Sequence, residues 1–293
     1  MDRRTVLHGG IQGMAALGVA DAAVAAEAGG STKTKRILFL DKGPLRQSKD
    51  RLYDPTKIEH ELNSYCGSPS TKIEVGFPDN YDGSQVGLAI GDQNKLNGLD
   101  HMMALPSLIR KMVWAEHNGY AAVISSNTFD PGVEGGRLAV KIPVIGLFRT
   151  AMHTALTLCD RIAITVPVES HIPYAWRLLR SYGLEKFVGD IRTIDIYGKD
   201  VAAHKKEIFD ATAALIKKIS HDTGAQIVVP LGGALIPYVV NPDDLAAATN
   251  VPVLNTKAIA VRFAESCIGL GMAQSPICYP HAELSEADFS KRI

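Results

Sequence analysis

Residues 121–146, AAVISSNTFDPGVEGGRLAVKIPVIG, contain the features that decide the fold. An apolar run at 121–125 ends in the polar tip Ser126-Asn127-Thr128, and a turn follows at Asp130-Pro131-Gly132. A short helical segment and a second apolar run at 142–146 complete the stretch. Short apolar runs that end in small polar residues are typical of buried parallel strands. Ligands of open α/β sheets bind beyond the carboxyl ends of the strands, so we expect chemistry at residues 126–130.

The same order of features occurs a second time. Residues 226–229 form an apolar run with Pro230-Leu231-Gly232-Gly233 at its tip, and the next apolar run is 251–255. A helix is expected after each second run, at 151–158 and at 258–268. This repetition predicts an α/β protein of two similar lobes, in which the two strand tips face each other across a cleft.

Other apolar runs and amphipathic segments fill the rest of the chain. The predicted strands are residues 36–40, 72–77, 161–166 and 191–197. The predicted helices are residues 102–118, 173–182 and 202–222. Residues 44–71 indicate a long polar excursion with the character of a lid, and the tail after residue 277 indicates surface.

Composition and the first thirty residues limit the class of protein. Hydrophobic residues make up 46% of the chain and the formal net charge is zero, which argues against nucleic acid or an acidic membrane surface as a partner.

Residues 1–30 contain Arg3 and Arg4 before a mildly apolar run with small-residue cleavage sites. This pattern favours a twin-arginine export signal over an ordinary N-terminal helix or tail. We therefore expect a periplasmic protein that has no membrane contact after cleavage.

The cysteines and histidines do not form a metal-binding pattern. No C-x-x-C spacing occurs among Cys66, Cys159, Cys267 and Cys278, and no H-E-x-x-H or H-x-x-E-H arrangement is present. A metal is therefore not expected. Three interpretations of Cys66 stay open at this point: an unreactive loop cysteine, a reactive thiol, or a disulfide partner of Cys278.

Four motifs, in order, resemble the aspartate/glutamate/hydantoin racemase superfamily, especially its hydantoin-racemase-like branch. They are Phe129-Asp130-Pro131-Gly132, IPVIG at 142–146, Leu231-Gly232-Gly233 and AIAVRFAE at 258–265. The resemblance implies two pseudo-twofold-related lobes with parallel sheets flanked by helices and an active-site cleft between them. It assigns residues 36–160 plus 256–293 to the first lobe and 161–255 to the second. It also implies cofactor-free chemistry at a carbon next to a carboxylate or carbonyl.

That chemistry normally uses two cysteines, one at each strand tip, and this chain has neither. The first position is Asn127, or Ser126 in another alignment, and the second is Gly233 or Gly232. An amide does not accept a proton near neutral pH, a hydroxyl is a poor base unaided, and glycine has no side chain. A two-cysteine racemase mechanism is therefore excluded. What survives is a pair of tips whose backbone N–H groups can hold a carboxylate or an oxyanion.

Another acid or base must then face the cleft if the protein is an enzyme. The turn after the strand at 161–166 offers His171, which titrates near neutral pH, with Glu169 to orient it and Tyr174 close by. The alternative is that Glu169 and Ser170 only cap the next helix. The predicted catalytic residues, strand-tip groups included, are His171, Glu169, Asn127, Ser126 and Tyr174.

A second set of residues is predicted to bind the substrate. It lies at the ends of strands or at the start of a helix, and comprises Asp41, Lys42, Thr128, Gly232, Gly233 and Arg149. Solvated side chains are the alternative for Lys42 and Arg149. Asp130 is expected to be structural, because the carboxylate of an Asp-Pro-Gly turn accepts backbone N–H groups.

The sequence thus favours a periplasmic, cofactor-independent enzyme on a racemase-like scaffold. Its substrate would be a small carboxylate or cyclic amide, and its chemistry that of a lyase, decarboxylase, isomerase or hydrolase. The competing hypothesis is a catalytically silent binding protein that captures such a molecule between the lobes. The sequence leaves the oligomeric state open, a homo-oligomer included.

Overall fold

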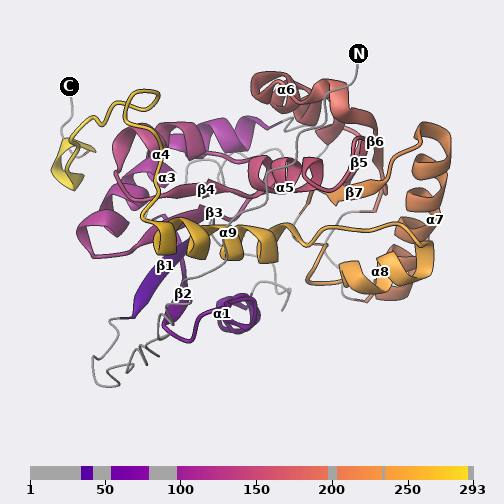
Figure 1. Cartoon of the computed structure of the whole chain (residues 1–293), viewed down its shortest axis with the longest axis horizontal. Coiled ribbons are helices and arrows are strands. Elements are labelled where there is room, and N and C mark those ends of the chain that lie inside the picture. Colours follow the sequence, from indigo (N-terminus) through magenta and orange to yellow (C-terminus); the bar gives the residue numbers. More distant parts are fainter. Residues whose placement is uncertain (1–33, 42–53, 79–97, 197–202, 233–234, 290–293) are drawn as a thin grey trace, which may run out of the picture. The chain divides into compact units, whose positions relative to one another are not determined.

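The computed structural model describes residues 34–41, 54–78, 98–196, 203–232 and 235–289 (Figure 1). Residues 1–33, which carry the predicted export signal, lie outside the described residues, so the signal and the periplasmic location stay predictions. Lys42 and Gly233 also lie outside them. None of the helices in the described ranges has both the length and the apolar character needed to cross a bilayer.

Four parallel strands form the first sheet, in the order β2-β1-β3-β4. They are β1 (Lys35–Leu40), β2 (Thr71–Gly76), β3 (Ala122–Ser125) and β4 (Val144–Gly146). The register pairs Leu40 of β1 with Gly76 of β2 and with Ser125 of β3. The carboxyl ends of the strands therefore lie level along one edge, where the predicted Ser126-Asn127-Thr128 tip begins.

Alternate residues of β1 and β3 face two different helical layers. Ile37, Phe39 and Ile124 pack with α1 (Pro55–Ser64) and α9 (Thr256–Leu270) on one face. Leu38 and Val123 pack with α3 (Leu99–His117) and α4 (Val133–Ala139) on the other. Burial on both faces explains why these strands are continuous apolar runs and do not alternate with polar residues.

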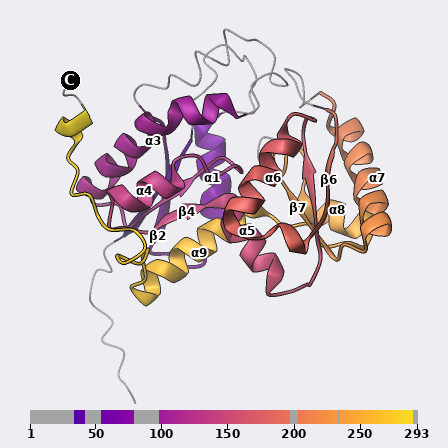
Figure 2. The same ribbon diagram turned by 90° about the horizontal axis from the view of Figure 1, so that it is seen from above.

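Three parallel strands form the second sheet, in the order β6-β5-β7. They are β5 (Ile162–Val166), β6 (Val188–Thr193) and β7 (Ile227–Pro230). The helices α5 (Leu147–Leu156) and α6 (His171–Tyr182) cover one face, and α7 (Lys205–Thr223) and α8 (Pro242–Thr249) cover the other. Figure 2 shows α6 and α7 on opposite sides of β6 and β7. The predicted α/β fold with parallel sheets flanked by helices is confirmed.

Two helices connect the two sheets. Helix α5 follows β4 of the first sheet, and its first residue, Leu147, packs in the core of that sheet, but most of its buried side chains pack against the second sheet. Helix α9 follows the second sheet in the chain and packs on β1 and β3 of the first sheet (Figure 1). The helices α5 and α9 also contact each other.

Three predicted segments differ from the structure. Residues 44–71, predicted as a polar excursion, contain α1 at 55–64, which buries Ile58 and Leu62, and residues 44–53 lie outside the described residues. Residues 251–255 form no strand; only Val253 makes a bridge, to Val228 of β7. The tail after residue 277 is partly packed, since Leu284 and Phe289 contact the core beside α3 and α4.

Candidate active site

The two predicted strand tips meet. The Gly232 N–H donates a hydrogen bond to Thr128 Oγ1 at 2.8 Å, which joins the tip after β7 to the tip after β3. The Gly232 backbone has φ +92°, and a Cβ atom there would lie 2.2 Å from a Pro167 ring carbon. Only glycine fits this approach. The carboxyl ends of the two sheets therefore converge on one place, where the repeated sequence pattern predicts them.

Asn127 shapes the first tip. Its Oδ1 atom accepts a hydrogen bond from the Phe129 N–H at 2.9 Å, and its backbone carbonyl accepts one from the Asp130 N–H at 3.0 Å. This side-chain-to-backbone turn uses the amide oxygen. The Nδ2 group then remains as a hydrogen-bond donor at the tip, so Asn127 can orient a carbonyl oxygen but cannot move a proton.

Asp130 holds the start of α5 against the first tip. Its carboxylate accepts hydrogen bonds from the Phe148 N–H, the Arg149 N–H and the Tyr182 hydroxyl, each at 2.9 Å. Burial raises the pKa of this carboxyl group, and the three donors oppose that shift. The predicted structural role agrees with this geometry, although the backbone donors belong to α5 and not to the Asp-Pro-Gly turn.

An aromatic cluster stands on the first tip. The Phe129 ring stacks on Tyr174 at a centroid distance of 4.6 Å, and the His171 ring meets it edge-on at 5.0 Å. The His101 ring lies 5.6 Å from Phe129 and 5.5 Å from Tyr174. His171 is the first residue of α6 and is half-buried. The structure therefore brings two predicted catalytic residues, His171 and Tyr174, to the strand tip.

Two other predicted site residues are placed differently. Glu169 is exposed, and no hydrogen bond or ion pair joins it to His171 among the described residues. The Arg149 guanidinium donates hydrogen bonds to Glu134 Oε1 at 3.1 Å and to the Tyr279 hydroxyl at 3.2 Å. Its charge is therefore matched by Glu134. Ser170 precedes α6 as its N-cap residue but makes no side-chain capping bond.

The sequence analysis missed two residues at this place. His101 is buried in the first turn of α3, with its Nε2 3.6 Å from Asp100 Oδ2. Lys257 is buried in the first turn of α9, and its electrostatic partners include Asp41, which follows β1. Neither residue belongs to a local motif. Only Lys257 could have been found from the sequence, because it is a charged residue at a position where the helical periodicity of α9 expects an apolar one.

The cysteines lie elsewhere in the structure. All four are free thiols, so Cys66 and Cys278 form no disulfide. Burial and the nearby Glu265 carboxylate raise the pKa of Cys66 to about 11, against a weaker opposing effect of Arg262. A thiol with that pKa is a poor nucleophile at neutral pH. In the part of the chain that the structure describes, no three His, Cys, Asp or Glu side chains gather as metal ligands.

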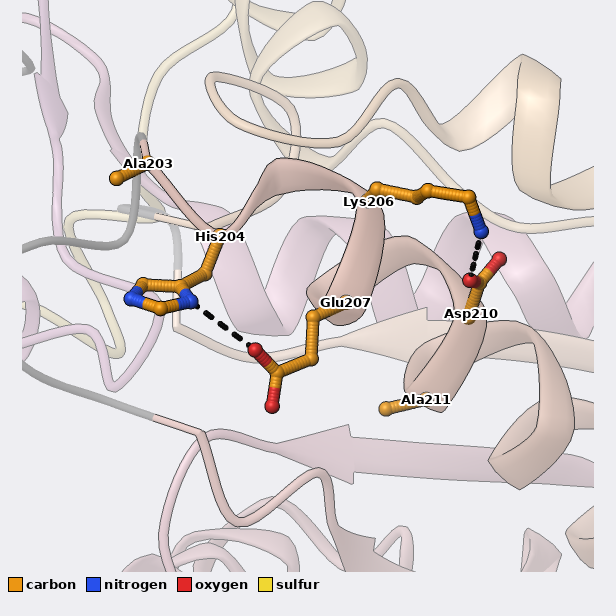
Figure 3. A pocket seen from close by; sticks show the side chains of 6 residues that line it. All are labelled: Ala203, His204, Lys206, Glu207, Asp210 and Ala211. Carbon is orange, nitrogen blue, oxygen red and sulfur yellow. Dashed lines mark hydrogen bonds and ion pairs between the residues drawn. The ribbon is translucent and has the colours of Figure 1, made fainter.

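A surface hollow of about 580 Å³ lies at the start of α7 (Figure 3). Its charged side chains pair with one another: His204 Nδ1 lies 3.0 Å from Glu207 Oε2, and Lys206 pairs with Asp210. These side chains are exposed and come from one helical segment. The hollow contains none of the strand-tip residues and is not the candidate site.

Comparisons with known proteins bear on the family and the fold. A family model described as Asp/Glu/hydantoin racemase matches residues 89–264. The hydantoin racemase of Rhizobium meliloti is 30% identical over 183 residues, 61% of this chain and 73% of that protein. The hydantoin racemase of Pseudomonas sp. (strain NS671) is 24% identical over 188 residues, 64% and 74% of the two. Allantoin racemase from Klebsiella pneumoniae has a similar fold, with a TM-score of 0.71 at 19% identity over 86% of this chain and 95% of that one.

Proposed function

Since the chain belongs to the Asp/Glu/hydantoin racemase family, we propose that it moves a proton at the carbon next to a carbonyl of a small cyclic amide. Both similar curated proteins are hydantoin racemases, and a hydantoin carries such a carbon between a carbonyl group and a ring nitrogen. The reaction proposed is isomerisation or hydrogen exchange at that carbon, without a cofactor and without thiols.

One observation carries the proposal: an imidazole stands where the two strand tips meet. The His171 ring packs edge-on against Phe129, which is next to Thr128, the residue hydrogen-bonded to Gly232. A neutral imidazole can remove a proton from carbon near pH 7, which Asn127 and Gly232 cannot do. Removal of the proton leaves an enolate. The enolate oxygen needs hydrogen-bond donors, and the Asn127 Nδ2 group is one at the tip.

Hydrogen–deuterium exchange tests this function directly. The full chain is incubated with one enantiomer of 5-benzylhydantoin in deuterated buffer, and loss of the ring C–H signal is followed by proton NMR, with optical rotation measured in parallel. We expect exchange above an enzyme-free blank at the same pH. Exchange with loss of optical rotation indicates racemisation, and exchange with retention indicates proton removal and return on one face. Tight binding without exchange would contradict the proposal and favour a binding protein.

Thiol alkylation provides a second prediction. Treatment with iodoacetamide until the accessible cysteines are modified is expected to leave the exchange rate within about twofold of the untreated protein, because neither tip carries a thiol. Mass spectrometry identifies the modified cysteines in the same sample. Stoichiometric inactivation that maps to Cys66 would overturn the thiol-free mechanism.

A further inference from the structure

Lys257 is a buried amine in the first turn of α9. Only 2% of the residue is exposed. The helix start is well ordered by its cap, because Asn255 Oδ1 accepts hydrogen bonds from the Lys257 and Ala258 N–H groups. The cap therefore fixes the backbone of Lys257 at the start of the helix.

The backbone places Lys257 at the edge where the strands end. Val253 pairs with Val228 in parallel, and the Leu254 N–H donates to the Val228 carbonyl. The segment therefore runs parallel to β7 and leaves it at the carboxyl edge of the second sheet, where α9 begins with Asn255 as its N-cap and Lys257 in its first turn. Asp41, which directly follows β1, lies close enough to Lys257 to raise the pKa of the amine, so the end of β1 is near Lys257 as well. The Ser126 N–H donates to the Leu40 carbonyl, so the β1 end adjoins the β3 tip.

The surroundings of the amine are partly apolar and partly acidic. Lys257 Nζ lies 3.2 Å from the centroid of the Tyr238 ring, a cation–π geometry. Burial lowers the pKa of Lys257 to about 7, and the Asp41 and Glu61 carboxylates oppose the shift. The Tyr65 hydroxyl donates to Glu61 Oε1 at 2.6 Å. A buried charge normally destabilises a fold compared with an apolar side chain of the same size, and such perturbed groups are concentrated at functional sites.

We propose that the Lys257 ammonium contacts the carbonyl oxygen of the substrate and supplies a proton or hydrogen bond to it as the enolate forms. The inference rests on the proposed function. His171 takes the proton from carbon, and the negative charge moves to the carbonyl oxygen, which Lys257 faces. When a proton returns to carbon, the carbonyl re-forms and Lys257 recovers its proton, so that no proton is gained or lost overall.

The proposal predicts a specific pH dependence. Lys257 must be charged and His171 neutral. The described groups that act on Lys257 include the Asp41 and Glu61 carboxylates and the Tyr238 ring, and Glu61 in turn accepts a hydrogen bond from the Tyr65 hydroxyl. The exchange rate should therefore fall as the pH rises above about 7, where the ammonium loses its proton. Lys257→Arg keeps a charge that does not titrate in this range, so this variant should lose the alkaline fall.

The experiment measures deuterium exchange of 5-benzylhydantoin from pH 5.5 to 9 for the wild type, Lys257→Met, Lys257→Arg and Lys217→Met. Lys217 is an exposed lysine of α7 and serves as the matched control. We expect Lys257→Met to lower the rate by ~100-fold, as the loss of one oxyanion donor does, and Lys217→Met to leave it unchanged. A Lys257→Met protein that keeps the wild-type rate and pH profile would overturn the inference and leave the proposed function standing.

A measurement without substrate tests the inference about Lys257 independently of the proposed function. Between pH 7 and the ordinary lysine pKa, the unfolded chain binds a proton that the folded chain does not, so the stability of the wild type rises with pH. The Tm of Lys257→Met should therefore exceed that of the wild type most at pH 6.5, and the difference should shrink towards pH 10. A constant difference would show that the amine is not buried as a titrating group and would overturn the inference.

If the wild type shows no exchange, the proposed function is refuted. Ligand binding then tests whether Lys257 contacts the ligand. The Tm shift caused by hydantoin at pH 6.5 is then compared among the variants. A shift lost in Lys257→Met and kept in Lys217→Met supports an amine that contacts the ligand. A shift kept in both variants, or absent from the wild type, overturns it.

Discussion

Replacing His171 by phenylalanine is expected to lower the exchange rate of a 5-substituted hydantoin by ~100- to 10,000-fold, the usual effect of removing a positioned general base. Phenylalanine preserves an aromatic ring against Phe129, where His171 packs edge-on at 5.0 Å. It removes only the ability to accept a proton. Hydantoin binding, measured as a Tm shift, should change much less, because the backbone and Asn127 at the strand tips remain.

Three further measurements test the assignment of His171. His117→Ala removes an exposed histidine at the end of α3 and should leave the rate unchanged. Tyr174→Phe keeps the ring that stacks on Phe129 and should reduce the rate only slightly. His171→Ala should recover part of its activity when imidazole is added to the buffer. Full activity in His171→Phe would show that the base is another group, and the buried His101 would be examined next.

The parts of the fold that the sequence predicted well are the buried strands. Strands β1, β3 and β5 were each predicted to within a residue, because strands covered on both faces are short, uninterrupted apolar runs. Strand β6 was predicted three residues too late. Only Val188 and Ile191 are buried and the other four residues are half-buried, so its apolar pattern is weaker and its boundaries are harder to place.

Among the described residues, the sequence analysis missed two helices, α1 and α8, and both are short. Both begin with the same local signal: Asp54-Pro55 before α1 and Asn241-Pro242 before α8. In each helix the Asp or Asn side chain accepts a hydrogen bond from the N–H two residues later, and proline occupies the first turn. This capping signal was present in the sequence, but it was not used at residues 54–55 and 241–242, where the apolar periodicity is weak.

The sequence could predict only those residues of the candidate site that directly follow a strand. The motif around Asn127 and the repeat ending at Gly232 predicted the two tips, since each tip directly follows an apolar strand in the sequence. The Asp41–Lys257 attraction joins residues far apart in the sequence, and it depends on α9 returning to the first sheet. A lysine in a helical pattern is normally solvated, so its burial becomes visible only when the tertiary packing is known.

The largest expected loss of stability comes from Asp130. Asp130→Ala should lower the free energy of unfolding by ~3–5 kcal/mol, because it leaves two backbone N–H groups of α5 and the Tyr182 hydroxyl without their acceptor in a buried place. It also removes a negative charge from the amino-terminal end of α5, where the helix dipole favours one. Urea unfolding followed by circular dichroism measures this change.

Two related variants show which of these contacts matters. Tyr182→Phe removes one donor and keeps the carboxylate, so it should cost only ~1–2 kcal/mol. Gly146→Ala tests the packing, because a Cβ at Gly146 would lie 2.6 Å from the Asp130 carboxyl carbon and would force the carboxylate away from its donors. We expect this variant to resemble Asp130→Ala. If Asp130→Ala unfolded at the wild-type urea concentration, water must satisfy the α5 donors, and the first tip would not depend on this carboxylate.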